Sequence, residues 1–254
     1  MYSLFISDTH LGSSEDGNIQ SLVINCIKSY AEQGKLDNLY LLGDIFNFWI
    51  GDEQINQPQI QDFLNYLIQL SLNGIKIFIM QGNRDFLMGK NLCNYLNCRL
   101  LPDPYILNLY SGNQDIKLLL THGDLLCTDD KNYQLLRKVV NNQRLQKIFL
   151  YFPYKIREKI ALYMRKLSIR KQQQSLKNNQ KNKNRYNFDI NYQALDLWHK
   201  KYNFDVLIHG HTHNTKLHKY TNYTRMVLSD WHKDGGTYAV FDGTKLYLKK
   251  YLVI

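Results

Sequence analysis

Residues 2–10 read Tyr-Ser-Leu-Phe-Ile-Ser-Asp-Thr-His, an apolar run of strand character that ends on a carboxylate and an imidazole. The arrangement recurs along the chain. Residues 38–42 form a second apolar run ending in Gly43-Asp44, and residues 75–80 form a third that precedes Gly82-Asn83-Arg84-Asp85. Apolar residues at helical spacing occupy the two intervals, and Gly34 and Gly74 end them. This order predicts a βαβαβ unit, and therefore a partly parallel sheet with helices packed on it.

Two further apolar runs lead into histidine motifs. Residues 116–120 precede Thr121-His122-Gly123-Asp124, and residues 206–208 precede Gly210-His211-Thr212-His213. Ligands of such sheets gather at the carboxyl ends of strands, so the motifs are expected to meet there. The tail holds three more apolar runs separated by Asp-Gly turn signals, which favour antiparallel pairing of those runs (226–228, 237–241 and 246–252). We expect one α/β domain over residues 1–254, with two sheets enclosed by helices.

Residues 129–187 interrupt this scheme because they carry no strand signal. Apolar residues from 145 to 152 form one helical stripe and those from 156 to 167 another, and Pro153 is expected to break the helix between them. The Gln-, Asn- and Lys-rich run from Ser168 to Arg185 is expected to be mobile at its tip. We interpret residues 129–187 as an inserted helical cap, or lid.

The formal net charge of +10 is concentrated in this cap. Between Lys155 and Arg185 there are eleven Lys and Arg against the single Glu158, and the chain totals of 32 basic and 22 acidic residues leave 21 of each elsewhere. A nucleic-acid-binding module is therefore one alternative, with binding that would depend steeply on salt. The stretch lacks the regular aromatic interleaving of single-strand binders, so we expect no nucleic-acid partner.

Cysteine usage and hydropathy point to a cytoplasmic protein. The four cysteines form no C-x-x-C pair, so neither a zinc knuckle nor a disulfide framework is indicated. The chain opens on a strand-like run and not on a signal peptide. No apolar run approaches the ~20 residues that a spanning helix needs.

The motif side chains are carboxylates, imidazoles and an amide, which suit paired divalent ions that polarise phosphoryl oxygens. Taken singly, Asp8 and Asp44 could be caps, and Gly82-Asn83 is a common turn dipeptide. His211 and His213 are harder to explain this way, since alternate residues of an extended strand end share a face. The conjunction predicts a dinuclear phosphoester or phosphoanhydride hydrolase. Purely structural metals fit poorly with a set that lacks cysteine.

The pattern D-x-H, G-D, G-N-R-D, H-G-D and G-H-T-H, from Asp8 to His213, resembles the calcineurin-like metallophosphoesterase superfamily. Within it, residues 44–52, 82–87 and 122–130 resemble the UDP-2,3-diacylglucosamine hydrolases of lipid A biosynthesis. This resemblance implies a four-layer αββα fold with two mixed sheets. It also implies cleavage of the pyrophosphate of UDP-2,3-diacylglucosamine to UMP and 2,3-diacylglucosamine 1-phosphate (lipid X).

The resemblance implies two Mn²⁺ per subunit as well. One ion would be held by Asp8, His10, Asp44 and His213. The other would be held by Asp44, Asn83, His122 and His211, with Asp44 as the bridge. The residues expected to be catalytic are Asp44, Asn83, Arg84 and His122.

Arg84 stands where many relatives have a histidine as general acid. A phosphate leaving group with a pKa of ~6 needs little protonation, whereas a planar Arg fork can clamp phosphates. A structural salt bridge is the alternative explanation for Arg84. The implied substrate contacts are Asn83, Arg84, Asp130, Ser168, Lys183 and His211, with Gln172 or Asn179 and Lys171 or Lys181 as competing positions in the cap.

The cap also bears on location. Its apolar stripes suit acyl chains and its basic face suits anionic lipid, so we expect a cytoplasmic enzyme that is peripheral on the inner membrane of a Gram-negative bacterium. The oligomeric state stays open, with a monomer favoured. The nearest alternative function is the same chemistry on a soluble nucleotide, a cyclic phosphodiester or a nucleic acid, although a soluble substrate would not need the aromatic cap.

Overall fold

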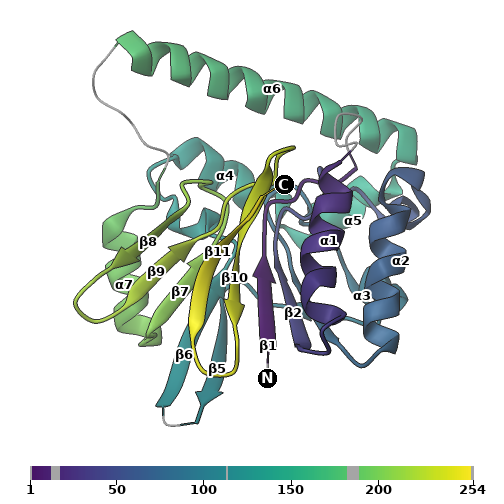
Figure 1. Cartoon of the computed structure of the whole chain (residues 1–254). Coiled ribbons are helices and arrows are strands. Elements are labelled where there is room, and N and C mark those ends of the chain that lie inside the picture. Colours follow the sequence, from purple (N-terminus) through teal and green to yellow (C-terminus); the bar gives the residue numbers. More distant parts are fainter. Residues whose placement is uncertain (1, 13–17, 113, 182–188, 253–254) are drawn as a thin grey trace.

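The computed structural model describes residues 2–12, 18–112, 114–181 and 189–252; it leaves out the side chains of residues 114, 168, 169 and 171–181. The described residues form eleven strands and seven α-helices around two mixed sheets (Figure 1). The predicted α/β class with paired sheets is confirmed.

The first sheet contains the predicted βαβαβ unit. Strands β1 (Tyr2–Ile6), β2 (Leu36–Leu42), β3 (Lys76–Met80) and β4 (Arg99–Leu101) run parallel. Antiparallel to β1 lies β10 (Gly235–Phe241), followed by β11 (Leu246–Leu252), which gives the order β11-β10-β1-β2-β3-β4. The helices that pack on this sheet are α1 (Ile19–Ala31), α2 (Pro58–Leu72) and α3 (Lys90–Leu96).

The second sheet has the order β5-β6-β7-β9-β8. Its strands are β5 (Tyr105–Ser111), β6 (Gln114–Thr121), β7 (Val206–His209), β8 (Lys216–Lys219) and β9 (Thr224–Val227). The three central strands are parallel, and each edge strand is antiparallel to its neighbour. Helix α7 (Tyr192–Tyr202) packs on the outer face.

Three apolar cores separate these layers. Leu4 faces the helices on the first sheet, while its neighbour Phe5 faces the second sheet, because successive side chains of a strand point to opposite faces. In the same way Leu118 lies between the sheets and Leu119 packs toward α7. Strands buried on both faces explain the continuous apolar runs of the sequence. The four-layer αββα arrangement follows.

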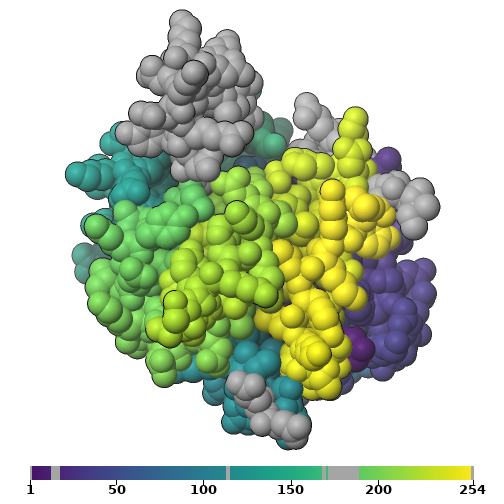
Figure 2. Space-filling view, turned by 60° about the vertical axis from the view of Figure 1, so that its left-hand side comes forward, coloured from purple at the N-terminus to yellow at the C-terminus, as the bar shows by residue number. Residues whose placement is uncertain are grey.

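One strand pairing differs from the prediction. The turn signal at residues 234–236 favours pairing of neighbouring tail strands, but β9 lies in the second sheet between β7 and β8. Only β10 and β11 form the predicted hairpin, across Asp242-Gly243. A turn signal is local and carries no information about which sheet a strand joins. Figure 2 shows the C-terminal hairpin (yellow) beside the yellow-green segment that contains β8 and β9.

The interrupting stretch forms α4 (Lys131–Val140), α5 (Gln143–Tyr151) and α6 (Tyr154–Lys181). The break at Pro153 is as predicted, while α6 continues beyond the apolar stripe into the Gln- and Asn-rich run as far as Lys181. In Figure 1, α6 lies across the end of the molecule toward which β1 points. None of the helices in the described ranges has a stretch long and apolar enough to cross a bilayer.

Candidate metal centre

The five motifs follow the parallel strands of both sheets. Asp8 follows β1, Asp44 follows β2 and Asn83 follows β3, whereas His122 follows β6 and His211 follows β7. Backbone hydrogen bonds join the loops: Asp8 N–H donates to the Gly43 carbonyl (3.1 Å) and Gly210 N–H to that of His122 (3.0 Å). The two sheets thus present their motifs to one another at the carboxyl ends of their strands.

The backbone at these positions is unusual. Seven non-glycine residues in the described ranges have positive φ, and five of them are candidate ligands: Asp8 (54°), His10 (49°), Asp44 (51°), His211 (63°) and His213 (54°). The other two are αL residues that end helices α3 and α7. Each left-handed non-glycine residue costs on the order of 1–3 kcal/mol, and such strain concentrates at functional sites.

One group of potential ligand atoms comprises Asp8, His10 and His213, which lie within 4.8 Å of one another. His213 Nε2 is 3.3 Å from Asp8 Oδ1. Both ring nitrogens of His10 are buried and have no hydrogen-bond partner. Because a buried polar atom normally has a partner, this imidazole is suited to a cation.

A second group surrounds Asn83. Its Oδ1 lies 2.9 Å from His122 Nε2 and 2.8 Å from His211 Nδ1. His122 Nδ1 lies 3.1 Å from the Leu42 carbonyl, so a neutral ring donates there and turns an Nε2 lone pair toward the amide oxygen. Two acceptors that face one another need a cation between them or a proton on the ring. Asp44 Oδ1 is 3.6 Å from the same Nε2.

Charge balance in this cluster favours a bound cation. Asp8 and Asp44 are 0% and 2% exposed, and buried carboxylates need positive partners. Burial raises the pKa of Asp8, but the His213 hydrogen bond and nearby imidazoles outweigh it and hold the pKa well below its usual value. Burial lowers the pKa of His122, yet Asp44 and Asp8 raise it to about 9. The buried carboxylates thus favour positive charge at this position, which a divalent cation would supply. The residues present therefore fit a divalent metal.

Two carboxylates that support the cluster had no assigned role in the sequence analysis. Asp85 accepts the backbone N–H groups of Gly82 (2.7 Å), Ile45 (2.8 Å), Asp44 (3.2 Å) and Phe46 (3.3 Å), so it ties the loops after β2 and β3 together. Burial and the Asp44 charge raise its pKa to about 7. Its place in the Gly82-Asn83-Arg84-Asp85 motif was the available signal.

Asp230 is the second such carboxylate. Its Oδ2 lies 3.0 Å from His213 Nδ1 and 2.9 Å from His232 Nε2. The backbone N–H of the next residue, Trp231, donates to the backbone carbonyl of Asp8 (3.1 Å), which holds the β9–β10 connection against the Asp8-Thr9-His10 motif. No sequence signal marks Asp230, because it lies outside all five motifs.

The predicted substrate contacts have different outcomes. Arg84 forms an ion pair with Asp44 (Nε to Oδ2, 3.4 Å) while its side chain stays 34% exposed, so it lies at the rim of the cluster. Asp130 accepts the Tyr133 N–H (3.0 Å) and caps α4. Lys183 lies outside the described residues, and the structure does not describe the side chains of Ser168 or of the competing cap positions 171, 172, 179 and 181.

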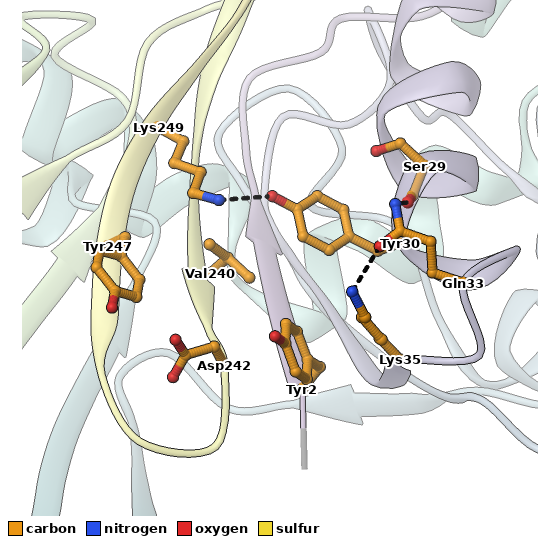
Figure 3. A pocket seen from close by; sticks show the side chains of 9 residues that line it. All are labelled: Tyr2, Ser29, Tyr30, Gln33, Lys35, Val240, Asp242, Tyr247 and Lys249. Atoms are coloured by element: carbon orange, nitrogen blue, oxygen red, sulfur yellow. Dashed lines mark hydrogen bonds between the residues drawn. The ribbon is translucent and has the colours of Figure 1, made fainter.

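Helix α4 is attached to the loop that carries His122 through Asp124. This carboxylate is 3% exposed and accepts hydrogen bonds from Tyr133 Oη (2.7 Å) and Arg137 Nε (2.6 Å), both on α4. The Tyr133 ring lies 5.7 Å from that of His211. A separate hollow is lined by none of the motif residues (Figure 3). Its lining residues are Tyr2, Ser29, Tyr30, Gln33, Lys35, Val240, Asp242, Tyr247 and Lys249.

Comparison with known proteins gives three results. A sequence model of the calcineurin-like phosphoesterases matches residues 1–215. A UDP-2,3-diacylglucosamine hydrolase of Neisseria meningitidis serogroup A is 37% identical over 239 residues, covering 94% of this chain and 93% of that protein, and one from Haemophilus influenzae is 36% identical, covering 92% of each. An archaeal phosphodiesterase structure is 12% identical with a TM-score of 0.45, covering 98% of this chain and 99% of the other.

Proposed function

The chain belongs to the calcineurin-like phosphoesterases and, among them, to the family of the UDP-2,3-diacylglucosamine hydrolases, and we propose that it hydrolyses UDP-2,3-diacylglucosamine to UMP and lipid X in lipid A biosynthesis. The observation that carries the proposal is the 36–37% identity to hydrolases of that name over more than nine-tenths of both chains. The five motifs converge at the carboxyl ends of strands from both sheets, which supports metal-dependent hydrolysis.

The proposed cofactor is a pair of Mn²⁺ ions. Asp8, His10 and His213 would hold one ion, Asn83, His122 and His211 the other, and Asp44 would contact both. When bound, divalent ions in such a site polarise phosphoryl oxygens and activate water for attack on phosphorus.

The protein's own groups prepare the site for this reaction. Asp230 orients His213 through Nδ1, and the Leu42 carbonyl orients His122 in the same way. The guanidinium of Arg84 is partly exposed beside Asp44, where it would bind a pyrophosphate oxygen and stabilise the charge that develops on the leaving phosphate. The leaving phosphate needs little protonation near neutral pH, since its pKa is ~6.

The proposed lid, residues 129–187 within a single domain, would receive the acyl chains. Described residues on either side of it are in contact, because Asn191 donates its backbone N–H to the Leu126 carbonyl (2.8 Å) and its Nδ2–H to Asp129 (2.7 Å). This segment carries many exposed apolar side chains: Leu145, Ile148, Phe152, Ile156, Ile160, Tyr163, Met164 and Leu167. Such a surface beside basic residues is suited to an acylated substrate and to peripheral binding at the cytoplasmic face of an inner membrane.

The test is UMP release from UDP-2,3-diacylglucosamine by the purified protein with Mn²⁺, with excess chelator, and after Mn²⁺ is restored. We expect release that requires the metal and returns with it. Release that is insensitive to chelator would contradict the metal centre. Metal-dependent hydrolysis of a simple phosphodiester without UMP release would instead favour a soluble nucleotide or nucleic-acid substrate.

A further inference from the structure

Arg157 is exceptional among the residues of α6. It is 2% exposed, and it is the single buried residue among the α6 side chains that the structure describes (154–167 and 170). A guanidinium is one of the most costly groups to bury, and its burial requires partners for its donors. The helix that carries much of the apolar surface of the lid is therefore attached to the protein through a charged group.

The partners of Arg157 lie mainly in the 50–57 segment, which includes the short 3₁₀ helix η1 (Asp52–Asn56). Nη1 donates to the Ile50 carbonyl and Nη2 to the Glu53 carboxylate, while Nε donates to the Phe152 carbonyl (2.9 Å). Nearby, Gln57 donates to Tyr154 Oη at the start of α6. The arrangement uses the Arg fork, which a lysine cannot reproduce.

The backbone of the 50–57 segment is shaped to admit this side chain. Gly51 has φ of 147°, and a Cβ at this position would overlap the Arg157 guanidinium. Glycine is thus required here both by the backbone conformation and by the close approach of the guanidinium.

The docking point is connected to the metal centre. The fully buried Trp49 directly precedes the segment, and its backbone N–H donates to the backbone carbonyl of Arg84 (3.1 Å). Arg84 in turn donates its backbone N–H to Asp44 (2.8 Å). The contact that holds α6 therefore lies next to the residue that is hydrogen-bonded to the proposed phosphate clamp, Arg84.

We propose that Arg157 is a positioning residue: it fixes α6 on the 50–57 segment and so sets the affinity for a large acylated substrate, without taking part in bond cleavage. This rests on the proposed function only for the identity of that substrate. A small phosphodiester that needs the metal centre but does not reach the lid is the natural comparison.

The experiment uses the full chain with Mn²⁺ and two substrates, UDP-2,3-diacylglucosamine and bis(p-nitrophenyl) phosphate. For Arg157→Ala we expect kcat/KM for the lipid nucleotide to fall roughly 30-fold or more, mainly through KM, while kcat/KM for the small diester stays within about threefold. Amide hydrogen exchange in α6 should become faster. Arg144→Ala is the matched control, since Arg144 is an exposed lid arginine on α5.

Two outcomes would overturn the proposal: equal losses on both substrates, or no loss on either with unchanged exchange in α6. If Arg157→Ala does not fold, Glu53→Gln removes one partner from the exposed side of the pair and should shift KM in the same direction by a smaller factor. If the wild type releases no UMP but still cleaves the small diester, the proposed substrate fails, while hydrogen exchange still decides whether Arg157 holds α6.

Discussion

Gly210→Ala is the sharpest test of the metal centre, because it changes one atom at the point where the two sheets meet. The backbone of Gly210 lies outside the left-handed region, so alanine introduces no strain there. Its Cβ would overlap Asp8 Oδ2 and Ser7 Oγ and approach Ser7 Cβ to 2.9 Å. Asp8 and Ser7 are both fully buried, so neither side chain can turn outward to solvent without disturbing its neighbours.

The size of the effect follows from the displacement. Ordinary Cβ contacts are 3.4–4 Å, so the Asp8 carboxylate would have to move by more than about 1 Å. That movement breaks its contacts with the His211 N–H (3.1 Å) and with His213 Nε2 (3.3 Å). A displacement of about 1 Å in a reactive centre costs on the order of 100-fold in rate, about 2.7 kcal/mol. Overpacking adds about 1–3 kcal/mol of lost folding stability.

The assay compares kcat/KM for UMP release and the Mn²⁺ affinity from titration calorimetry in Gly210→Ala, Gly89→Ala and wild type. Gly89 is the control, since a Cβ there would meet nothing closer than the Leu87 carbonyl at 3.9 Å. A thermal melt shows that each variant is folded. Wild-type kcat/KM and Mn²⁺ affinity in Gly210→Ala would refute the role assigned to Asp8.

Three further predictions concern single side chains. Asp44→Asn should lower kcat/KM by more than about 100-fold with little change in melting temperature, because a lost metal ligand costs more than a lost hydrogen-bond partner of a ligand. Near-normal turnover in this variant would show that Asp44 is not a metal ligand. Asp230→Asn should weaken Mn²⁺ affinity roughly 10–100-fold by calorimetry, whereas Asp234→Asn, an exposed neighbour, should leave it unchanged. Burial raises the pKa of Asp189, but its hydrogen bond to Arg225 (2.7 Å) and the charge of that guanidinium outweigh it and hold the pKa below 3.8. This ion pair therefore stabilises the fold above pH ~4, so Asp189→Asn should lower the free energy of unfolding by about 3–5 kcal/mol in denaturant titrations at neutral pH. The difference in unfolding free energy between wild type and variant should narrow as pH falls below ~4, and a difference independent of pH would contradict this role.

Much of this protein could be predicted from local sequence. Strands buried on both faces are continuously apolar, so β1, β2, β3, β6 and β7 could be recognised together with the polar motif residues that follow them. The helix break at Pro153 is equally local, because proline lacks the N–H that the helix needs. The stretch Gly82-Asn83-Arg84-Asp85 contains the supporting carboxylate Asp85 and one of its four backbone donors, Gly82, but the other three donors lie in the loop after β2.

Contacts outside the five motifs were decided by the tertiary structure alone. The turn signal after β9 is compatible with either sheet, and packing between the sheets selects the second one. Asp230 and Arg157 belong to no motif, and each acquires its role from partners that are distant in sequence, His213 and Ile50. The physical reason is that periodicity and local motifs report backbone conformation and side-chain type over a few residues. A buried charge finds its partner only when the chain brings together residues that are tens of positions apart, and local patterns do not extend over that distance.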